Sequence, residues 1–206
     1  MSIQAYGKSG MNIVDPILFQ CKYSPSSVAI CAPGTRLNVV SYGQLERWIH
    51  NISRTALSLG LEPGQIAAIF IKDKIFHAAV IYGLTRIGVV TLSARDPQFP
   101  SELRVDAVIT DTAQAFGNVE RIIHADRTWI MGDGEPLEDA RVHHGSTDEI
   151  CRIILTSGST GEPKAVAFSH KMLADRISRY AFVKGDRFPH GSRLYCDLGI
   201  DRKSVV

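Results

Sequence analysis

The sequence predicts an α/β fold, in which helices pack against a mostly parallel sheet. Three observations lead to this prediction. Strand-like apolar runs alternate with amphipathic helical segments through the first half of the chain, residues 66–71 form a continuously apolar run, and turn residues separate the segments. The 206 residues are 45% hydrophobic and 21% charged, which suits a globular protein of one domain, or one and a part.

The first predicted helix follows two short β-rich runs, residues 28–32 and 37–40, which a Pro-Gly turn separates. Ser41 is a candidate N-cap, and Gln44 stands three residues on, as a capping box requires. Apolar residues then recur at helical spacing until Gly60, where a C-terminal glycine ends the helix.

The run at residues 66–71 predicts a strand buried on both faces. Asp73 is placed to cap a second helix, which Gly88 ends, and residues 89–92 are again strand-like. This β-α-β-α-β order indicates a mostly parallel sheet flanked by helices.

The second half alternates less regularly. Residues 119–124 fit either a short helix or a strand, and residues 132–149 are predicted to form a surface excursion. Ser169 is a candidate cap for a helix that follows. Further strands are predicted at residues 105–110, 128–131, 150–155, 165–168 and 193–200.

Composition excludes several classes of function. The net charge of +2 gives no case for nucleic acid, and the most apolar span, residues 65–92, carries too many charges for a membrane span. The start of the chain lacks the apolar region of a secretory signal. The four cysteines form no C-x-x-C pair, so we expect unpaired thiols, a cytoplasmic protein and no metal-ligating residues.

The segment at residues 156–164 has the chemistry of an anion site. Its six consecutive small residues, TSGSTG, offer hydroxyl donors on a permissive backbone, and Lys164 adds a cation. Glycines let the backbone approach a ligand, and successive N–H groups form a concave nest for anions. This combination suits a polyphosphate. A flexible linker is less consistent with the strand-like runs on both sides, and the spacing fits neither a kinase-type P-loop nor a dinucleotide fingerprint.

The run LTSGSTGEPK, from Leu155 to Lys164, closely resembles the phosphate-binding signature of the adenylate-forming superfamily. That superfamily includes acyl-CoA synthetases, nonribosomal peptide synthetase adenylation domains and luciferases. Weaker features resemble it in the same order: VSYGQL at residues 40–45, the stretch 83–97, and His170. The resemblance spans about residues 12–200. Ala165 departs from it, because the family usually has glycine there, and a positive φ at that position would cost alanine about 1 kcal/mol or more.

The resemblance implies an ATP-dependent ligase. A carboxylate attacks the α-phosphate of ATP, and the resulting acyl group passes to the thiol of coenzyme A or of a phosphopantetheine arm. Mg²⁺ accompanies ATP, and the partners are a small-molecule carboxylate and, in some relatives, a carrier protein. The residues implied in phosphate binding are Thr156, Ser157, Gly158, Ser159, Thr160, Gly161 and Lys164. No catalytic residue is assigned.

The resemblance also implies a fragment. Residues 1–11 are interpreted as a polar extension and residues 12–200 as an incomplete N-terminal AMP-binding domain, with the small C-terminal domain absent. Residues 201–206 equal the translation of a common sequencing adapter, so we expect them to be non-native and the 206-residue chain to be inactive alone. Two alternatives stay open: a nucleotide-binding regulatory or inactive truncated paralogue without catalysis, and an unrelated α/β binding protein with a chance loop.

Overall fold

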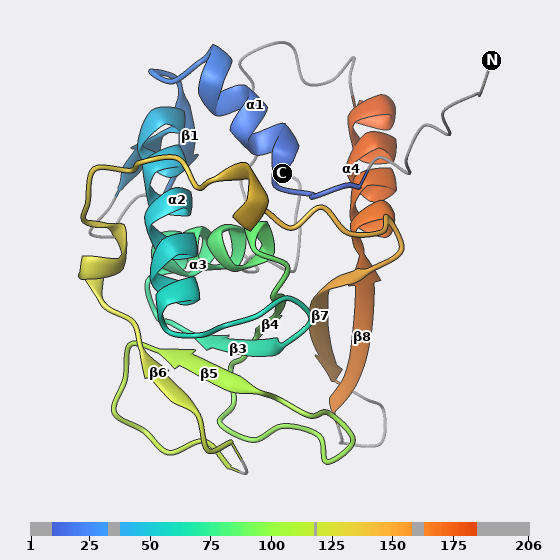
Figure 1. Ribbon diagram of the computed structural model, residues 1–206. Helices are drawn as coiled ribbons and strands as arrows, with labels where there is room; N and C mark the ends of the chain where they lie inside the picture. Colours follow the sequence, from blue (N-terminus) through green and yellow to red (C-terminus); the bar gives the residue numbers. More distant parts are fainter. Residues whose placement is uncertain (1–9, 33–37, 118, 158–162, 185–206) are drawn as a thin grey trace, which may run out of the picture.

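The computed structural model describes residues 10–32, 38–117, 119–157 and 163–184, and its centre is a six-stranded sheet (Figure 1). The strand order is β6-β5-β3-β4-β7-β8, and every neighbouring pair is parallel except β7 and β8. The predicted α/β class with a mostly parallel sheet is confirmed. The strands are β3 (Ile66–Phe70), β4 (Val90–Ser93), β5 (Ala107–Thr110), β6 (Ile122–His124), β7 (Ile150–Ser157) and β8 (Pro163–Ser169).

Three helices gather on one face of this sheet, and a fourth follows β8 (Figure 1). The helices are α1 (Asp15–Tyr23), α2 (Tyr42–Ser58), α3 (Lys74–Arg86) and α4 (His170–Lys184). The main core lies between α2, α3 and the sheet, where Ile49, Ile52 and Ile69 are fully buried. A separate antiparallel pair, β1 (Val28–Cys31) and β2 (Val39–Ser41), lies beside α1 and α2.

Both predicted helix starts are confirmed in atomic detail. The Ser41 hydroxyl accepts from the backbone N–H of Gln44, and the Gln44 side chain accepts from the N–H of Ser41, which completes a capping box. One carboxylate oxygen of Asp73 accepts from the N–H groups of Ile75 and Phe76, each at 3.0 Å. Polar residues at these two positions therefore fix where α2 and α3 begin.

Among the described residues, loop segments cover the second face of the sheet. Phe116 is buried there against Leu92 and Val108, and its ring meets that of Phe70 edge-on with 5.2 Å between centroids. The strands β3, β4 and β5 are thus buried on both faces, which the continuous apolar run at residues 66–71 predicted for β3.

The strand predicted at residues 128–131 is wrong, because this segment forms the 3-10 helix η1 (Arg127–Ile130). The Asp126 carboxylate accepts from the N–H of Thr128 at 2.8 Å and from its hydroxyl at 2.5 Å. Such a local side-chain bond competes with extended backbone and starts a turn. Residues 119–124, where helix and strand stayed open, contain β6. The strand predicted at residues 193–200 lies outside the described residues.

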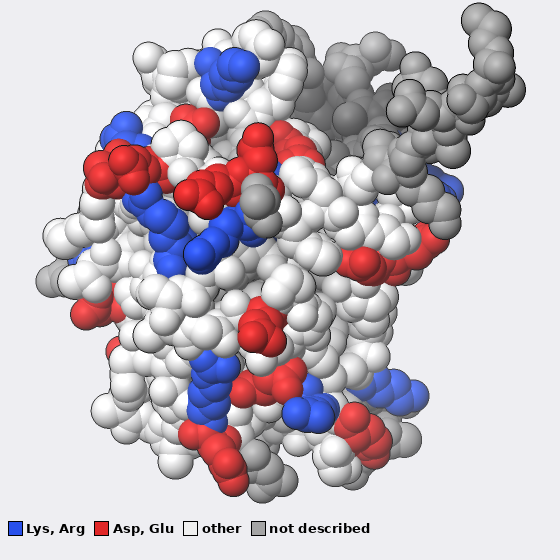
Figure 2. Space-filling view, in the orientation of Figure 1, with Lys and Arg blue, Asp and Glu red and all other residues white. Residues whose placement is uncertain are grey.

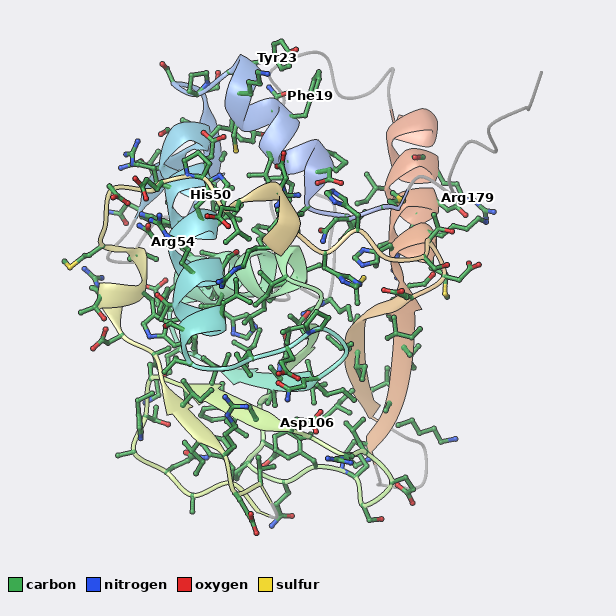
Figure 3. The ribbon with its side chains drawn as sticks, viewed as in Figure 1. Phe19, Tyr23, His50, Arg54, Asp106 and Arg179 are labelled. Carbon is green, nitrogen blue, oxygen red and sulfur yellow. The ribbon has the colours of Figure 1, made fainter. Side chains whose placement is uncertain are left out.

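The surface excursion predicted at residues 132–149 is only partly exposed. It contains the short 3-10 helix η2 (Asp139–Arg141), and Leu137 and Val142 are buried. The N–H of Leu137 donates to Nδ1 of His50 at 3.2 Å, and Arg54 pairs with acidic side chains of the loop; Figure 3 shows His50 and Arg54 on α2 beside this segment. Burial, with the charges of Arg86 and Arg54, lowers the pKa of His50, consistent with a neutral acceptor ring.

Candidate functional site

The candidate phosphate segment is carried by an antiparallel hairpin. Strand β7 extends to Ser157 and β8 begins at Pro163, so both strands run further toward the turn than their predicted ends at residues 155 and 165. The structure therefore confirms that the segment joins two strands. Residues 158–162, which hold Gly158, Ser159, Thr160 and Gly161, lie outside the described residues, and greater mobility of this segment stays a prediction.

The described end of the hairpin places Thr156 opposite Lys164. Directly opposed residues of an antiparallel pair project to the same face of the sheet, so the hydroxyl and the ammonium lie on one side. The Thr156 hydroxyl donates to the Lys164 carbonyl oxygen at 3.3 Å, and both residues are exposed. This hydroxyl must turn from that carbonyl to donate to a phosphate, whereas the Lys164 side chain extends from the strand into solvent.

The far end of the hairpin is fixed by α4. The Ser169 hydroxyl accepts from the N–H of Met172 at 3.2 Å, which confirms the predicted cap. His170, which is 2% exposed, accepts from the N–H of Ile13 at its Nδ1 atom, 3.1 Å away. Burial lowers the pKa of His170, so the neutral ring that this bond requires is favoured. His170, the residue that follows β8, thus ties the hairpin to the start of α1.

A polar network lies beneath β7 that the sequence interpretation missed. Arg152 is 7% exposed and donates to the hydroxyls of Thr91, at 3.1 Å, and Ser93, at 2.6 Å. The Ser93 hydroxyl also lies 2.8 Å from Nε2 of His77 on α3. The available signal was an arginine inside the apolar run ICRIIL, since charged residues enter a buried strand only when they are paired or hydrogen-bonded.

The sequence of the chain matches a known family over most of its length. Residues 19–201 match the family described as AMP-binding enzyme. The chain belongs to this family. The resemblance stated from LTSGSTGEPK is therefore confirmed at the level of the family.

Individual relatives of this chain share about a quarter of its residues in the matched regions. Nonribosomal peptide synthetase agiA of Aspergillus flavus is 26% identical over 210 residues, which cover 90% of this chain and 3% of that protein. Bacitracin synthase 1 of Bacillus licheniformis is 26% identical over 196 residues, covering 88% of this chain and 4% of that protein. The chain therefore spans a small part of the curated relatives that it matches.

Solved structures share the fold. A complex of VinN with L-aspartate gives a TM-score of 0.73 at 24% identity, covering 94% of this chain and 52% of that one. The N-terminal subdomain of Klebsiella oxytoca NpsA gives a TM-score of 0.60 at 21% identity, covering 80% of this chain and 43% of that one. At these identities the likeness establishes the fold alone.

Ala165 carries no backbone strain. It lies in β8 opposite Leu155, and no non-glycine residue within the described ranges has a positive φ. The energetic cost foreseen for alanine at a positive φ therefore does not arise. The position is exposed, which leaves room for the methyl group.

The surroundings of the site carry mixed charge. Figure 2 shows acidic and basic side chains interspersed on the viewed face of the molecule, without a continuous basic stripe among the described residues. An apolar groove of about 660 Å³ lies between α1, α3 and α4 and includes Tyr82, Arg152 and Ile177. Burial raises the pKa of the Tyr82 phenol, while the nearby Arg152 charge lowers it.

Three of the cysteines, Cys21, Cys31 and Cys151, are free thiols, as predicted, and Cys196 lies outside the described ranges. The described segments contain no helix long and apolar enough to cross a membrane. They also hold no cluster of three or more His, Cys, Asp or Glu side chains able to bind a metal ion.

Proposed function

We propose that this chain supplies the phosphate-binding part of an ATP-dependent carboxylate ligase, which forms an acyl-adenylate and then an acyl thioester. The observation that carries the proposal is the hairpin β7–β8, which places Thr156 and Lys164 opposite each other on one face at the base of a small-residue turn. A turn of this composition offers N–H and hydroxyl donors, and the lysine adds a positive charge.

In the first step a carboxylate oxygen attacks the α-phosphorus of ATP, and the bond from that phosphorus to the bridging oxygen of the β-phosphate breaks. The electron pair leaves with pyrophosphate. Donors that hold the β- and γ-phosphates stabilise the charge that develops on this leaving group. We assign that role to Lys164 and to the hydroxyl or backbone donors of Thr156, Ser157, Ser159 and Thr160, with Gly158 and Gly161 shaping the turn. Mg²⁺ accompanies ATP and offsets part of the phosphate charge.

In the second step a thiol sulfur attacks the acyl carbon, and AMP leaves. The matched curated relatives include proteins named nonribosomal peptide synthetases, which favours a phosphopantetheine arm on a carrier protein over coenzyme A as the acceptor. The substrate is a small-molecule carboxylate. The proposal includes a cytoplasmic location and, for the 206-residue chain alone, binding of nucleotide without turnover.

The test compares Lys164→Ala with Lys171→Ala. Lys171 is an exposed lysine on α4 that pairs with Asp175 at 3.4 Å, so its loss controls for a change of charge away from the turn. Losing a charge-assisted contact to phosphate costs about 1.5–3 kcal/mol, which is roughly tenfold or more in affinity. We expect isothermal titration calorimetry of the 206-residue chain to show pyrophosphate binding weakened by about this factor in Lys164→Ala, and unchanged in Lys171→Ala.

Catalysis is tested separately, in a version of the protein extended to the length of its relatives. Carboxylate-dependent exchange of labelled pyrophosphate into ATP would support the ligase. Binding of ATP without exchange for any carboxylate would support the alternative of a regulatory or inactive paralogue. Equal pyrophosphate affinity of the wild-type chain and Lys164→Ala would remove Lys164 from the site.

A further inference from the structure

Arg152 is a buried cation within the strand that leads to the phosphate turn. Its side chain is on the same face of β7 as that of Thr156, because the two are separated by an even number of residues in an extended strand. The spacing of four residues corresponds to about 13 Å. Arginine stays protonated in proteins, and burying a charge is unfavourable unless hydrogen bonds or opposite charges compensate it.

The hydrogen bonds from Arg152 run in one direction across the sheet. Arginine has only donors, so the hydroxyl oxygens of Thr91 and Ser93 on β4 accept from it. The hydroxyl proton of Thr91 returns to β7 through a bond to the Cys151 carbonyl oxygen at 3.2 Å. Two strands are therefore joined by side chains as well as by their backbone ladder.

The second branch reaches α3 and the end of β3. The Ser93 hydroxyl, which already accepts from Arg152, has its proton available for Nε2 of His77 at 2.8 Å. A carbonyl oxygen only accepts, so Nδ1 of His77 donates to the Ile71 carbonyl, 3.3 Å away. The network thus connects β7, β4, α3 and the residue after β3.

The backbone ties between β7 and the rest of the sheet end close to Arg152. Between the described parts of β4 and β7, the parallel register consists of Thr91 opposite Arg152 and Leu92 opposite Ile153. β8 pairs with β7 along its length, but β4 does so only as far as Ile153. The residues of β8 from Pro163 to Ala167 are exposed. The outer half of the hairpin therefore projects beyond the sheet, and the Arg152 network lies at the point where it leaves.

We propose that Arg152 is a positioning residue, which holds the outer half of β7 and β8 in register and thereby places the phosphate-binding turn. The expected effect on phosphate binding rests on the proposed function, whereas the effect on the hairpin itself does not. The role does not require Arg152 to touch ATP, because Thr156, where the candidate segment begins, lies about 13 Å further along the strand. Arg152→Met keeps the length of the side chain and removes its donors, whereas Arg152→Lys keeps the charge and one group of donors.

The matched control is Ser53→Ala. The Ser53 hydroxyl is fully buried between α2 and α3 and lies 2.8 Å from the carbonyl oxygens of both Ile49 and Gly83. Its loss removes a buried polar contact from the same core, away from β7. Both Ser53→Ala and Arg152→Met are therefore expected to lower the stability of the whole chain. An effect that appears in Arg152→Met alone indicates loss of the positioning role.

The first measurement is amide hydrogen exchange of the 206-residue chain without nucleotide. We expect Arg152→Met to speed exchange at residues 154–157 and 164–166 by about tenfold or more, the loss typical of a hydrogen bond to a charged group. Arg152→Lys and Ser93→Ala should give smaller increases at the same amides, and Ser53→Ala none beyond the change common to the whole chain. Equal exchange at these amides in Arg152→Met and Ser53→Ala, relative to the core strands, overturns the proposal.

The second measurement is the dissociation constant for pyrophosphate in the same variants. An increase of about fivefold or more in Arg152→Met, with partial rescue by Arg152→Lys, supports positioning of the turn. Faster exchange with an unchanged dissociation constant overturns the effect on phosphate. If the wild-type chain binds no pyrophosphate, the proposed function fails, while the exchange data still decide whether Arg152 holds the hairpin.

Discussion

The contact between α2 and α3 makes a sharp prediction at Gly83. A Cβ atom added there would meet Cγ2 of Ile52 at 2.5 Å and its Cβ at 2.7 Å. Carbon atoms in contact are normally about 3.5–4.0 Å apart, so the helices would have to separate locally by about 1 Å. Ile52 is fully buried, and the new methyl group therefore has no solvent-exposed side chain to displace.

Two effects of Gly83→Ala oppose each other. Alanine favours a helix interior over glycine by up to about 1 kcal/mol, whereas overpacking a core costs typically about 1–3 kcal/mol and occasionally more. The clash involves the Cβ as well as Cγ2 of a buried β-branched residue, so we expect the upper part of that range to apply. The predicted net loss is about 1–2 kcal/mol in the free energy of unfolding, or about 2–8 °C in Tm for a chain of this size.

Gly43→Ala is the matched control, because Gly43 is also a helical glycine. A Cβ atom at that position would lie 3.2 Å from the Pro25 carbonyl oxygen, a much milder contact. Urea and thermal unfolding followed by circular dichroism would measure both variants. We expect Gly43→Ala to lie within about 0.5 kcal/mol of wild type. A Gly83→Ala variant as stable as wild type would refute the packing argument.

Further predictions follow from single contacts. Asp73→Ala removes the cap of α3 and should lower the free energy of unfolding by about 0.5–2 kcal/mol, whereas Asp73→Ser should retain most of it; equal stability of the two variants would contradict the cap. The pKa of His170 and that of His50 are both lowered in the folded protein, chiefly by burial, so the unfolded chain binds more protons as pH falls through about 6.5. Stability should therefore decrease from pH 7 toward pH 5, and His170→Gln should flatten that dependence; an unchanged slope in urea midpoints would count against it. Cys151, whose pKa burial raises to about 11, should react with a thiol reagent far more slowly than the exposed Cys31, and equal rates would contradict its burial.

The parts of the fold that local chemistry determines could be predicted from the sequence. Ser41 with Gln44, and Asp73 alone, marked the helix starts because capping depends on residues within one turn of each other. The strand at residues 66–71 was recognisable because a parallel strand buried on both faces is apolar throughout. The strand predicted at residues 128–131 was wrong because the side chain of Asp126, which precedes the segment, accepts a hydrogen bond from Thr128 and starts a 3-10 helix despite the strand propensity of the residues that follow.

The candidate site likewise has a part that local sequence predicts and a part that depends on the fold. The small residues and Lys164 lie close together in the sequence, so their chemistry could be inferred without a structure. The strands on either side were predicted a little too short. Arg152 and Ser93 come together only because β4 and β7 are neighbours in the sheet, although the two residues are 59 positions apart along the chain. Pairing between distant strands depends on topology, which apolar periodicity does not specify.

The central claim is that the hairpin β7–β8 binds polyphosphate, and titration of the isotope-labelled 206-residue chain with Mg²⁺-ATP, followed by amide NMR, tests it most directly. We expect saturable shifts that are largest at Thr156, Ser157 and Lys164 and that weaken in Lys164→Ala. Pyrophosphate should compete for the same resonances. Saturable shifts at the apolar groove beside Tyr82 with none in the hairpin, or no shifts at all, would contradict the account.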